Sequence, residues 1–189
     1  STLAWAALAV SAVLVGFSKT ALPGINTLAV AIFAAVLPAK PSTGALLLLL
    51  IVGDMFALWT YRKHAHWPTL IRMLPAVLVG LALGAAFLAF AGDSLVRRVI
   101  GVMLLMLMAL TLWQRHRDAA LRDDDAAPPA PASRAVAAGY GSLGGFTTMV
   151  ANAGGPVMSM YFLAARFPKH AFLGTAAWFF AVMNLLKVP

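Results

Sequence analysis

Lys19 places a cation inside a strongly hydrophobic stretch, where a charged side chain is rare unless it has a function. Ser18 and Thr20 flank it, and the next apolar run begins near Pro23 and Gly24. The first N–H groups of a helix starting there would point into the same interruption. An ammonium, two hydroxyls and a helix N-terminus together favour an oxyanion. The alternative is that Lys19 marks a loop between two thin membrane helices.

A second polar interruption carries hydroxyl and amide groups but no cation. Thr147, Thr148 and Asn152 precede the glycine pair Gly154-Gly155. Glycine lets the backbone approach a ligand closely and adopt positive φ, so these residues are candidates for the same binding site. The alternative is close helix packing, because small residues are common where membrane helices meet.

Asp54 and Asn184 are isolated polar residues within other apolar runs. An intramembrane carboxylate can carry a coupling proton or pair with a buried lysine, and Lys19 is the obvious partner in sequence. A carboxylate that hydrogen-bonds neighbouring helix ends is an equally good interpretation. Lys187 ends the same run as Asn184. Its side chain could reach the site or extend to the membrane interface, and we favour the interface.

These marks recur at an offset of 130 residues, which indicates an internal repeat. The recurring pairs are Gly24 and Gly154, Pro38 and Pro168, Gly44 and Gly174, and Asp54 and Asn184. Short hydrophobic segments that are interrupted at corresponding places in two halves point to a transporter's binding site.

The composition is that of a membrane protein: 62% of residues are hydrophobic, 11% are charged, and the mean hydropathy is +0.88. The net charge of +8 does not indicate nucleic-acid binding, because the basic residues mostly flank apolar runs, as membrane anchors do. Without cysteine there is no disulfide or thiolate site. His64 and His66 lack metal-binding companions, and no nucleophile–base pair is present, so we expect no metal, no cofactor and no enzyme.

The chain divides into a first transmembrane repeat (1–113), a polar cytoplasmic linker (114–134) and a second repeat (135–189). The first half has apolar runs at about 2–17, 24–38, 43–61, 73–91 and 95–113, and the second at about 135–151, 155–167 and 171–187. The first two runs of each half are shorter than the roughly 20 residues that a spanning helix needs. Each pair forms either two thin crossings or one re-entrant hairpin. Both counts are odd, so the second repeat must be inverted.

Charges orient this topology. The basic residues at 62–72 place that loop in the cytoplasm, which puts the 166–169 loop on the same side and Lys40 outside. Arg97 and Arg98 oppose the rule unless they extend from a helix end. By symmetry, about 60 further residues are expected after Pro189.

The sequence resembles the sulfite exporter TauE/SafE family, also called the toluene sulfonate uptake permeases. The resemblance rests on residues 16–20 with Pro23-Gly24, and in the second half on Gly144-Gly145-Phe146, residues 154–156, 174–176 and 184–187. It implies a multi-pass permease of the bacterial inner membrane for small sulfur-containing anions such as sulfite, sulfoacetate or other organosulfonates. The chain departs from the family in being shorter, and no lysine in its second repeat matches Lys19.

The leading hypothesis is an all-α secondary carrier that moves such an anion, driven by protons or the membrane potential. The substrate would bind between the two interruptions, with membrane lipid around the protein and a homodimer as one arrangement. The substrate-binding residues would be Lys19, Ser18, Thr20, Gly24, Thr147, Thr148, Asn152, Gly154 and Gly155, with Asp54 and Asn184 as coupling or structural polar groups. The alternative is a passive anion channel or a non-transporting membrane subunit of a larger complex.

Overall fold

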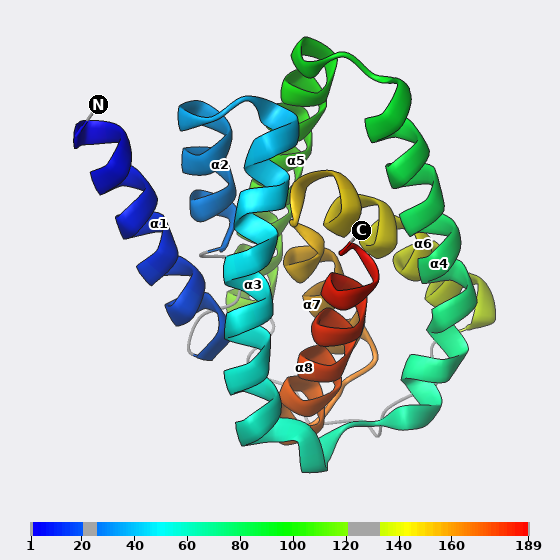
Figure 1. Ribbon diagram of the computed structural model, residues 1–189. Coiled ribbons are helices and arrows are strands. Elements are labelled where there is room, and N and C mark those ends of the chain that lie inside the picture. The colour runs from blue at the N-terminus through cyan, green and yellow to red at the C-terminus, as the bar shows by residue number, and fades with distance from the viewer. Residues whose placement is uncertain (1, 21–25, 121–132, 189) are drawn as a thin grey trace.

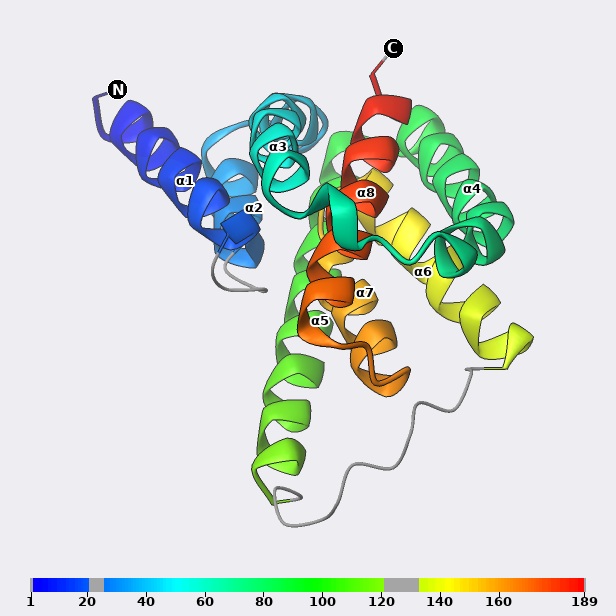
Figure 2. The ribbon, with the colours of Figure 1, turned by 90° about the horizontal axis from the view of Figure 1, so that it is seen from below.

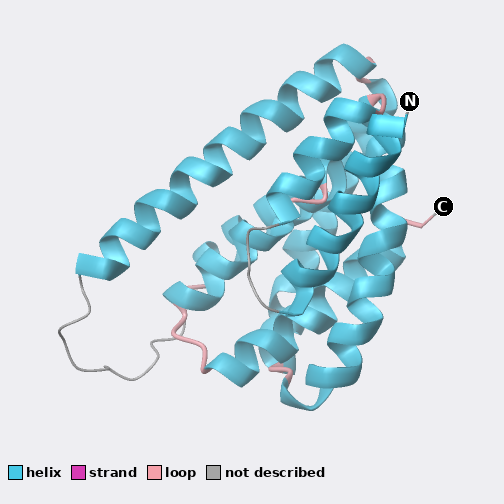
Figure 3. Cartoon of the chain, turned by 90° about the vertical axis from the view of Figure 1, so that its left-hand side faces the viewer, coloured by secondary structure: helices cyan, strands magenta, loops and turns pink. Residues whose placement is uncertain are grey.

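The computed structural model describes residues 2–20, 26–120 and 133–188, and within these ranges the chain is helical with no strand (Figure 3). The helices are α1 (Thr2–Thr20), α2 (Asn26–Val36), α3 (Ala39–Tyr61), α4 (Trp67–Phe90), α5 (Asp93–Ala120), α6 (Arg134–Ala151), α7 (Gly154–Ala164) and α8 (Lys169–Leu186), with a short 3₁₀ turn, η1 (Arg62–His64), between α3 and α4. The apolar runs therefore predicted the helices well. One difference is that α5 continues to Ala120, beyond the end of its apolar run at residue 113.

Helices α3 and α8 lie side by side and antiparallel at the centre of the molecule (Figure 1). Helices α1 and α2 pack on one side of them and α4 and α6 on the other, while α5 crosses behind; the view from below shows the same order (Figure 2). The antiparallel contact follows from two points: Gly174 near the start of α8 meets the backbone of Tyr61 at the end of α3, and Asn184 meets Asp54 further along.

Helices α4 and α6 pack along each other more extensively than any other pair of described elements. Glycines four residues apart on both helices, Gly80 and Gly84 on α4 and Gly141 and Gly145 on α6, allow this close approach. A methyl group on Gly145 would collide with the carbonyl oxygen of Val77. Gly145, named above only as part of the family resemblance, therefore lies at a close helix crossing.

Two apolar clusters flank the central helices. The first joins α1, α2, α3, α5 and the α6–α7 region, and includes Phe33, Leu46 and Ile100, each at most 4% exposed. The second joins α4, α6, α7 and α8 around Met73, Phe162 and Phe179. The first cluster includes residues of α3 and the second residues of α8, so both central helices pack into apolar surroundings.

The outward faces of the long helices are apolar as well. Trp59 is 77% exposed, Leu105 72% and Phe90 92%, and many other large apolar side chains on α3, α4 and α5 are exposed with them. Among the described residues, three helical segments are long and apolar enough to cross a membrane: Ala39–His64, Trp67–Phe90 and Asp93–Trp113. Apolar exposure on this scale is expected of a surface in contact with lipid. This is an all-α membrane fold.

The two ends of the bundle differ in their connections. At one end the α3–α4 link meets the α7–α8 loop, with the rings of His64 and His170 5.2 Å apart and the indole of Trp178 donating to the carbonyl oxygen of Arg62 (3.2 Å). The two basic loops predicted to share one side of the membrane are therefore adjacent. At the other end, Arg97 donates to the carbonyl oxygen of Leu37 at the end of α2 (3.3 Å), which accounts for a cation that opposed the charge rule.

The short helices α2 and α7 are both 11 residues long and are both followed by a proline that caps the next helix. Pro38 has φ −55° and ψ 145°, and Pro168 has φ −57° and ψ 146°. Proline in this extended conformation ends one helix and starts another without needing an N–H donor. The order of long, short and long helices in α1–α3 thus recurs in α6–α8.

Candidate functional site

Asn152 forms the break between α6 and α7. It has φ 51° and ψ 26°, the left-handed conformation that asparagine tolerates better than most residues, and its N–H bonds the carbonyl oxygen of Thr148 (3.1 Å). The chain therefore turns sharply at a buried position, and α7 starts two residues later at Gly154. A methyl group on Gly154 would stand 2.9 Å from Cβ of Thr148, so this glycine permits the tight turn.

The side chain and carbonyl of Asn152 connect this break to three other helices. Its Nδ2 donates to the carbonyl oxygen of Thr43 in α3 (2.8 Å), and its Oδ1 accepts from Nζ of Lys187 at the end of α8 (2.6 Å). Its own carbonyl oxygen accepts from Nδ2 of Asn26 at the start of α2 (2.8 Å). Asn152, between the end of α6 and the start of α7, thus links α2 and α3 of the first half to α8 of the second.

Asp54 and Asn184, the repeat-related polar residues, contact each other directly. Nδ2 of Asn184 donates to Oδ2 of Asp54 over 2.6 Å, and both residues are 1% exposed. A carboxylate buried this deeply needs hydrogen-bond donors, and the amide is one of them. The pair lies where the antiparallel α3 and α8 cross, so equivalent positions of the two halves meet.

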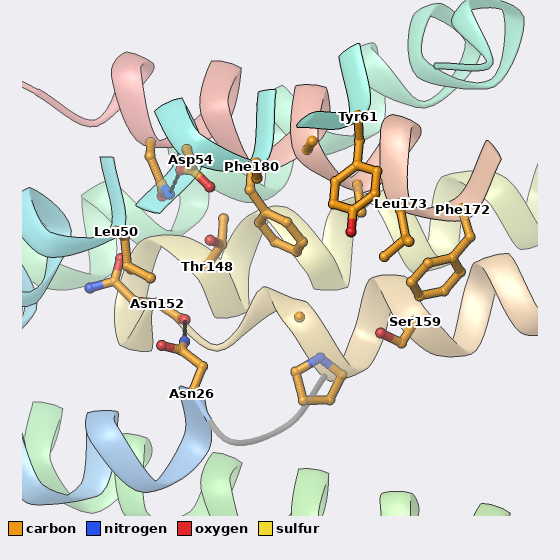
Figure 4. A pocket seen from close by; sticks show the side chains of 16 residues that line it. Asn26, Leu50, Asp54, Tyr61, Thr148, Asn152, Ser159, Phe172, Leu173 and Phe180 are labelled. Atoms are coloured by element: carbon orange, nitrogen blue, oxygen red, sulfur yellow. Dashed lines mark hydrogen bonds between the residues drawn. The ribbon is translucent and has the colours of Figure 1, made fainter. Parts of the chain in front are cut away.

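A cavity of about 100 Å³ lies between the Asp54–Asn184 pair and the α6–α7 break (Figure 4). Its volume corresponds to a few water molecules at roughly 30 Å³ each. Its polar and small lining residues are Asn26, Asp54, Tyr61, Thr148, Asn152, Gly155, Ser159 and Asn184, and its apolar wall includes Leu50, Phe172, Leu173 and Phe180. Figure 4 shows the Tyr61 hydroxyl directed into this space from α3 and Asn26 approaching it from the start of α2.

Two buried oxygens in this region have no hydrogen-bond donor within the described part of the chain. They are Oδ1 of Asn26 and Oδ1 of Asn184, and both residues line the cavity. Buried amide oxygens are nearly always paired in folded proteins, because an unpaired one costs about 1–3 kcal/mol. The cavity is therefore suited to a guest that can donate hydrogen bonds, such as water or a protonated ligand.

The structure brings together some of the sequence-predicted site residues and separates others. Thr148, Asn152 and Gly155 line the cavity with Asp54 and Asn184. Thr147 does not line it: its hydroxyl donates to the carbonyl oxygens of its own helix at Leu143 (2.8 Å) and Gly144 (3.3 Å). Gly154 packs against Thr148, as described above.

The oxyanion site predicted around Lys19 in the first half lies at the edge of the described residues. Ser18, Lys19 and Thr20 form the last residues of α1, and their side chains lie outside the described part of the structure, as does Gly24. Asn26, the first residue of α2, does line the cavity, so the start of the second helix reaches the site.

Sequence reasoning missed Asn26, Tyr61 and Ser159, and of the two positions open to Lys187 it favoured the one that the structure does not show. The expectation that Lys187 extends to the membrane interface is wrong, since its ammonium bonds Asn152 and the carbonyl oxygen of Thr148 (3.0 Å). Asn26 and Ser159 were visible as polar residues in apolar segments, but both are small and neither stands at a repeat-related polar position. Only the three-dimensional structure, which places the end of α8 beside the α6–α7 break, shows where the side chain of Lys187 can reach.

The site offers hydroxyl and amide groups, a carboxylate and a nearby ammonium, a set suited to binding and releasing a small polar solute. The described residues contain no group of three or more potential metal ligands.

No curated protein and no solved structure gives a significant match to this chain. The chain does match the protein family described as "Sulfite exporter TauE/SafE", over residues 8–189, which takes in the α1–α2 and α6–α7 breaks, the cavity and the Asp54–Asn184 pair. The resemblance read from the glycine and proline motifs is confirmed, and the chain belongs to the sulfite exporter TauE/SafE family.

Proposed function

We propose that this protein is a secondary transporter of small sulfur-containing anions, and that the cavity between α3, the α6–α7 break and α8 is its substrate site. The main support is that one cavity is lined by the broken helix at Asn152, by the hydroxyl-bearing residues Thr148 and Ser159, and by the buried carboxylate of Asp54. Membership of a transporter family gives the general class, a permease for sulfur anions.

The substrate in this proposal is a small oxyanion such as sulfite, with sulfoacetate and other organosulfonates as larger candidates. Thr148 and Ser159 supply hydroxyl donors, and Gly155 leaves backbone accessible because no atom lies within 4 Å of where its Cβ would be. Lys19 is the proposed charge partner from the first half. The volume of about 100 Å³ favours an anion of a few heavy atoms.

Asp54 is the proposed carrier of a coupling proton. An anion that enters the cavity would face the carboxylate of Asp54 across a short distance, and repulsion between like charges is relieved if the carboxyl group takes up a proton. A neutral carboxyl would still accept from Asn184 and could donate to the substrate. Binding of the anion and of the proton would thereby favour each other.

Alternating access in this proposal comes from an inverted repeat. The equivalent prolines Pro38 and Pro168 lie at opposite ends of the bundle, and the equivalent helices α3 and α8 are antiparallel, which is what an inverted repeat requires. At about 1.5 Å per residue, α2 and α7 would each extend about 16 Å, roughly half of a hydrocarbon core. This favours re-entrant segments whose tips meet near the membrane midplane.

The proposed setting is the bacterial inner membrane, with the α3–α4 link and the α7–α8 loop in the cytoplasm. A homodimer is a compatible arrangement. The competing function is a passive anion channel or a membrane subunit that does not transport by itself.

Counterflow in proteoliposomes tests the carrier against the channel. Vesicles loaded with unlabelled sulfite should accumulate labelled sulfite transiently and saturably, which a channel does not do. Thr148→Val removes a hydroxyl from the cavity with little change in shape, and should raise the half-saturating concentration about 5-fold or more, since one hydrogen bond contributes about 1 kcal/mol.

Thr111→Val is the matched control, because the Thr111 hydroxyl bonds the carbonyl oxygen of Leu107 in α5 (2.7 Å) and does not line the cavity. It should transport like the wild type. Absence of counterflow for every sulfur anion offered would contradict the proposed function.

A further inference from the structure

Lys187 places a cation beside the helix break of the second half, whose own residues include none. It directly follows α8, and its Nζ donates to Oδ1 of Asn152 (2.6 Å) and to the carbonyl oxygen of Thr148 (3.0 Å). Both acceptors belong to residues that line the cavity. The ammonium is therefore one hydrogen bond away from the proposed substrate space.

Two acceptors of this ammonium, Oδ1 of Asn152 and the carbonyl oxygen of Thr148, carry no formal charge. They lie at the C-terminal end of α6, where exposed carbonyls attract a cation. An oxyanion that accepts from the ammonium adds the attraction between opposite full charges, which a neutral oxygen does not supply. A substrate oxygen that reached Nζ would therefore displace the amide oxygen of Asn152.

Lys187 is accessible at the surface of the helix packing. The residue is half-buried and borders an open hollow of about 230 Å³. The wall of this hollow comes mainly from α4, with Leu78, Leu81, Ala82 and Ala85, and otherwise from Met149 and Leu186. Lys187 is the cationic residue in the lining of this hollow.

Lys187 lies at the same end of α8 as Asn184, which belongs to the buried Asp54–Asn184 pair. Asn184, three residues earlier, donates to Asp54, while Lys187 donates to Asn152. Both acceptor residues, Asp54 and Asn152, line the cavity. The C-terminal end of α8 is thus hydrogen-bonded to two residues on different walls of the cavity, Asp54 of α3 and Asn152 of the α6–α7 break.

We propose that Lys187 is the substrate's charge partner in the second half, and that binding exchanges the Asn152 amide oxygen for a substrate oxygen. This inference rests on the proposed function. No lysine of the second repeat matches Lys19 in sequence, and Lys187 would supply the corresponding charge. The exchange frees Asn152 on its α8 side while its bonds to Thr43 and Asn26 remain. Occupancy of the site is thereby communicated to α2 and α3.

The test compares Lys187→Met and Lys187→Gln with the wild type in two assays that use sulfite as the probe. The first is the half-saturating sulfite concentration for current in proteoliposomes. The second is the rise in unfolding temperature that saturating sulfite produces in purified protein. Gln keeps a donor for Asn152 without the charge, so it preserves the contact with the break if Met impairs folding.

Both variants should raise the half-saturating concentration about 10- to 100-fold, and both should lose most of the sulfite-induced rise in unfolding temperature. Lys187→Arg, which keeps the charge, should restore much of each. Lys169→Met, an exposed lysine in the first turn of the same helix, is the control and should behave like the wild type.

A purely structural lysine would give a different pattern. The variants would then unfold at lower temperature without ligand but keep the full sulfite-induced rise and the wild-type half-saturating concentration, which would overturn the inference while leaving the transporter intact. A wild type that shows neither current nor a temperature rise with sulfite, sulfoacetate, taurine or sulfate would overturn the proposed function, and this inference with it.

Discussion

Removing the amide of Asn184 should destabilise the protein because it takes a donor from a carboxylate that is 1% exposed. The bond is 2.6 Å long and links α3 to α8 across the centre of the bundle. A hydrogen bond to a charged group contributes about 1.5–3 kcal/mol, so Asn184→Leu should lower the free energy of unfolding by about 2 kcal/mol. Asp54→Leu should cost about 1–3 kcal/mol, because it leaves both ends of the buried Asn184 amide without partners.

The double variant is the informative one. With both polar groups replaced by apolar side chains, neither partner is left unpaired, and the cost should fall well below the sum of the two single costs. We expect an interaction energy of about 1–3 kcal/mol between the two substitutions. Chemical unfolding in mixed micelles, followed by the fluorescence of the five tryptophans, gives each free energy.

An exposed pair serves as the control cycle. Arg97 and Asp93 stand 4.0 Å apart with side chains 50% and 44% exposed, and such a pair should show an interaction energy of about 0.5 kcal/mol or less. If the Asp54–Asn184 cycle is additive within about 0.5 kcal/mol, the two side chains do not interact as described and the reasoning is refuted.

Three further predictions follow from the packing and the site. Gly145→Ala should destabilise the protein by about 1–3 kcal/mol, because the added methyl group meets the backbone of α4. Gly139→Ala is the control on the same helix: its methyl group would meet no neighbouring atom within 4 Å, so it should be neutral or stabilising by up to about 1 kcal/mol. Equal unfolding temperatures for the two variants would contradict the described crossing. Asp54→Asn should still bind sulfite, since an amide can accept from Asn184, but transport should lose its dependence on pH; an unchanged pH profile would exclude Asp54 as the proton carrier. Lys19→Ala should raise the half-saturating sulfite concentration about 10-fold or more, and wild-type affinity in a folded variant would remove Lys19 from the site.

The sequence predicted the helical segments because hydrophobic runs and prolines are local signals. Pro38 and Pro168 each precede a long helix, and the interruption before Gly154 became the left-handed turn at Asn152. The offset between Asp54 and Asn184 indicated equivalence but not contact. Contact follows only from the antiparallel packing of α3 on α8, which depends on residues far apart in the chain.

Other parts of the site had no local signal. Tyr61 ends an apolar helix and could have been an interfacial aromatic residue, yet it lines the cavity because α8 starts beside it. Lys187 was assigned to the interface because long basic side chains at helix ends usually extend there. It turns inward because the carbonyl oxygen of Thr148 and the amide of Asn152 lie within its reach.

The most direct test of the central claim is substrate-induced current on a solid-supported membrane that carries the protein in liposomes. Sulfite, sulfoacetate, taurine, sulfate and chloride would be offered in turn to the wild type and to Thr148→Val. We predict a saturating current for at least one sulfur oxyanion, with a higher half-saturating concentration in the variant and no response to chloride. A linear, non-saturating current for all anions, or no current for any of them, would contradict the account.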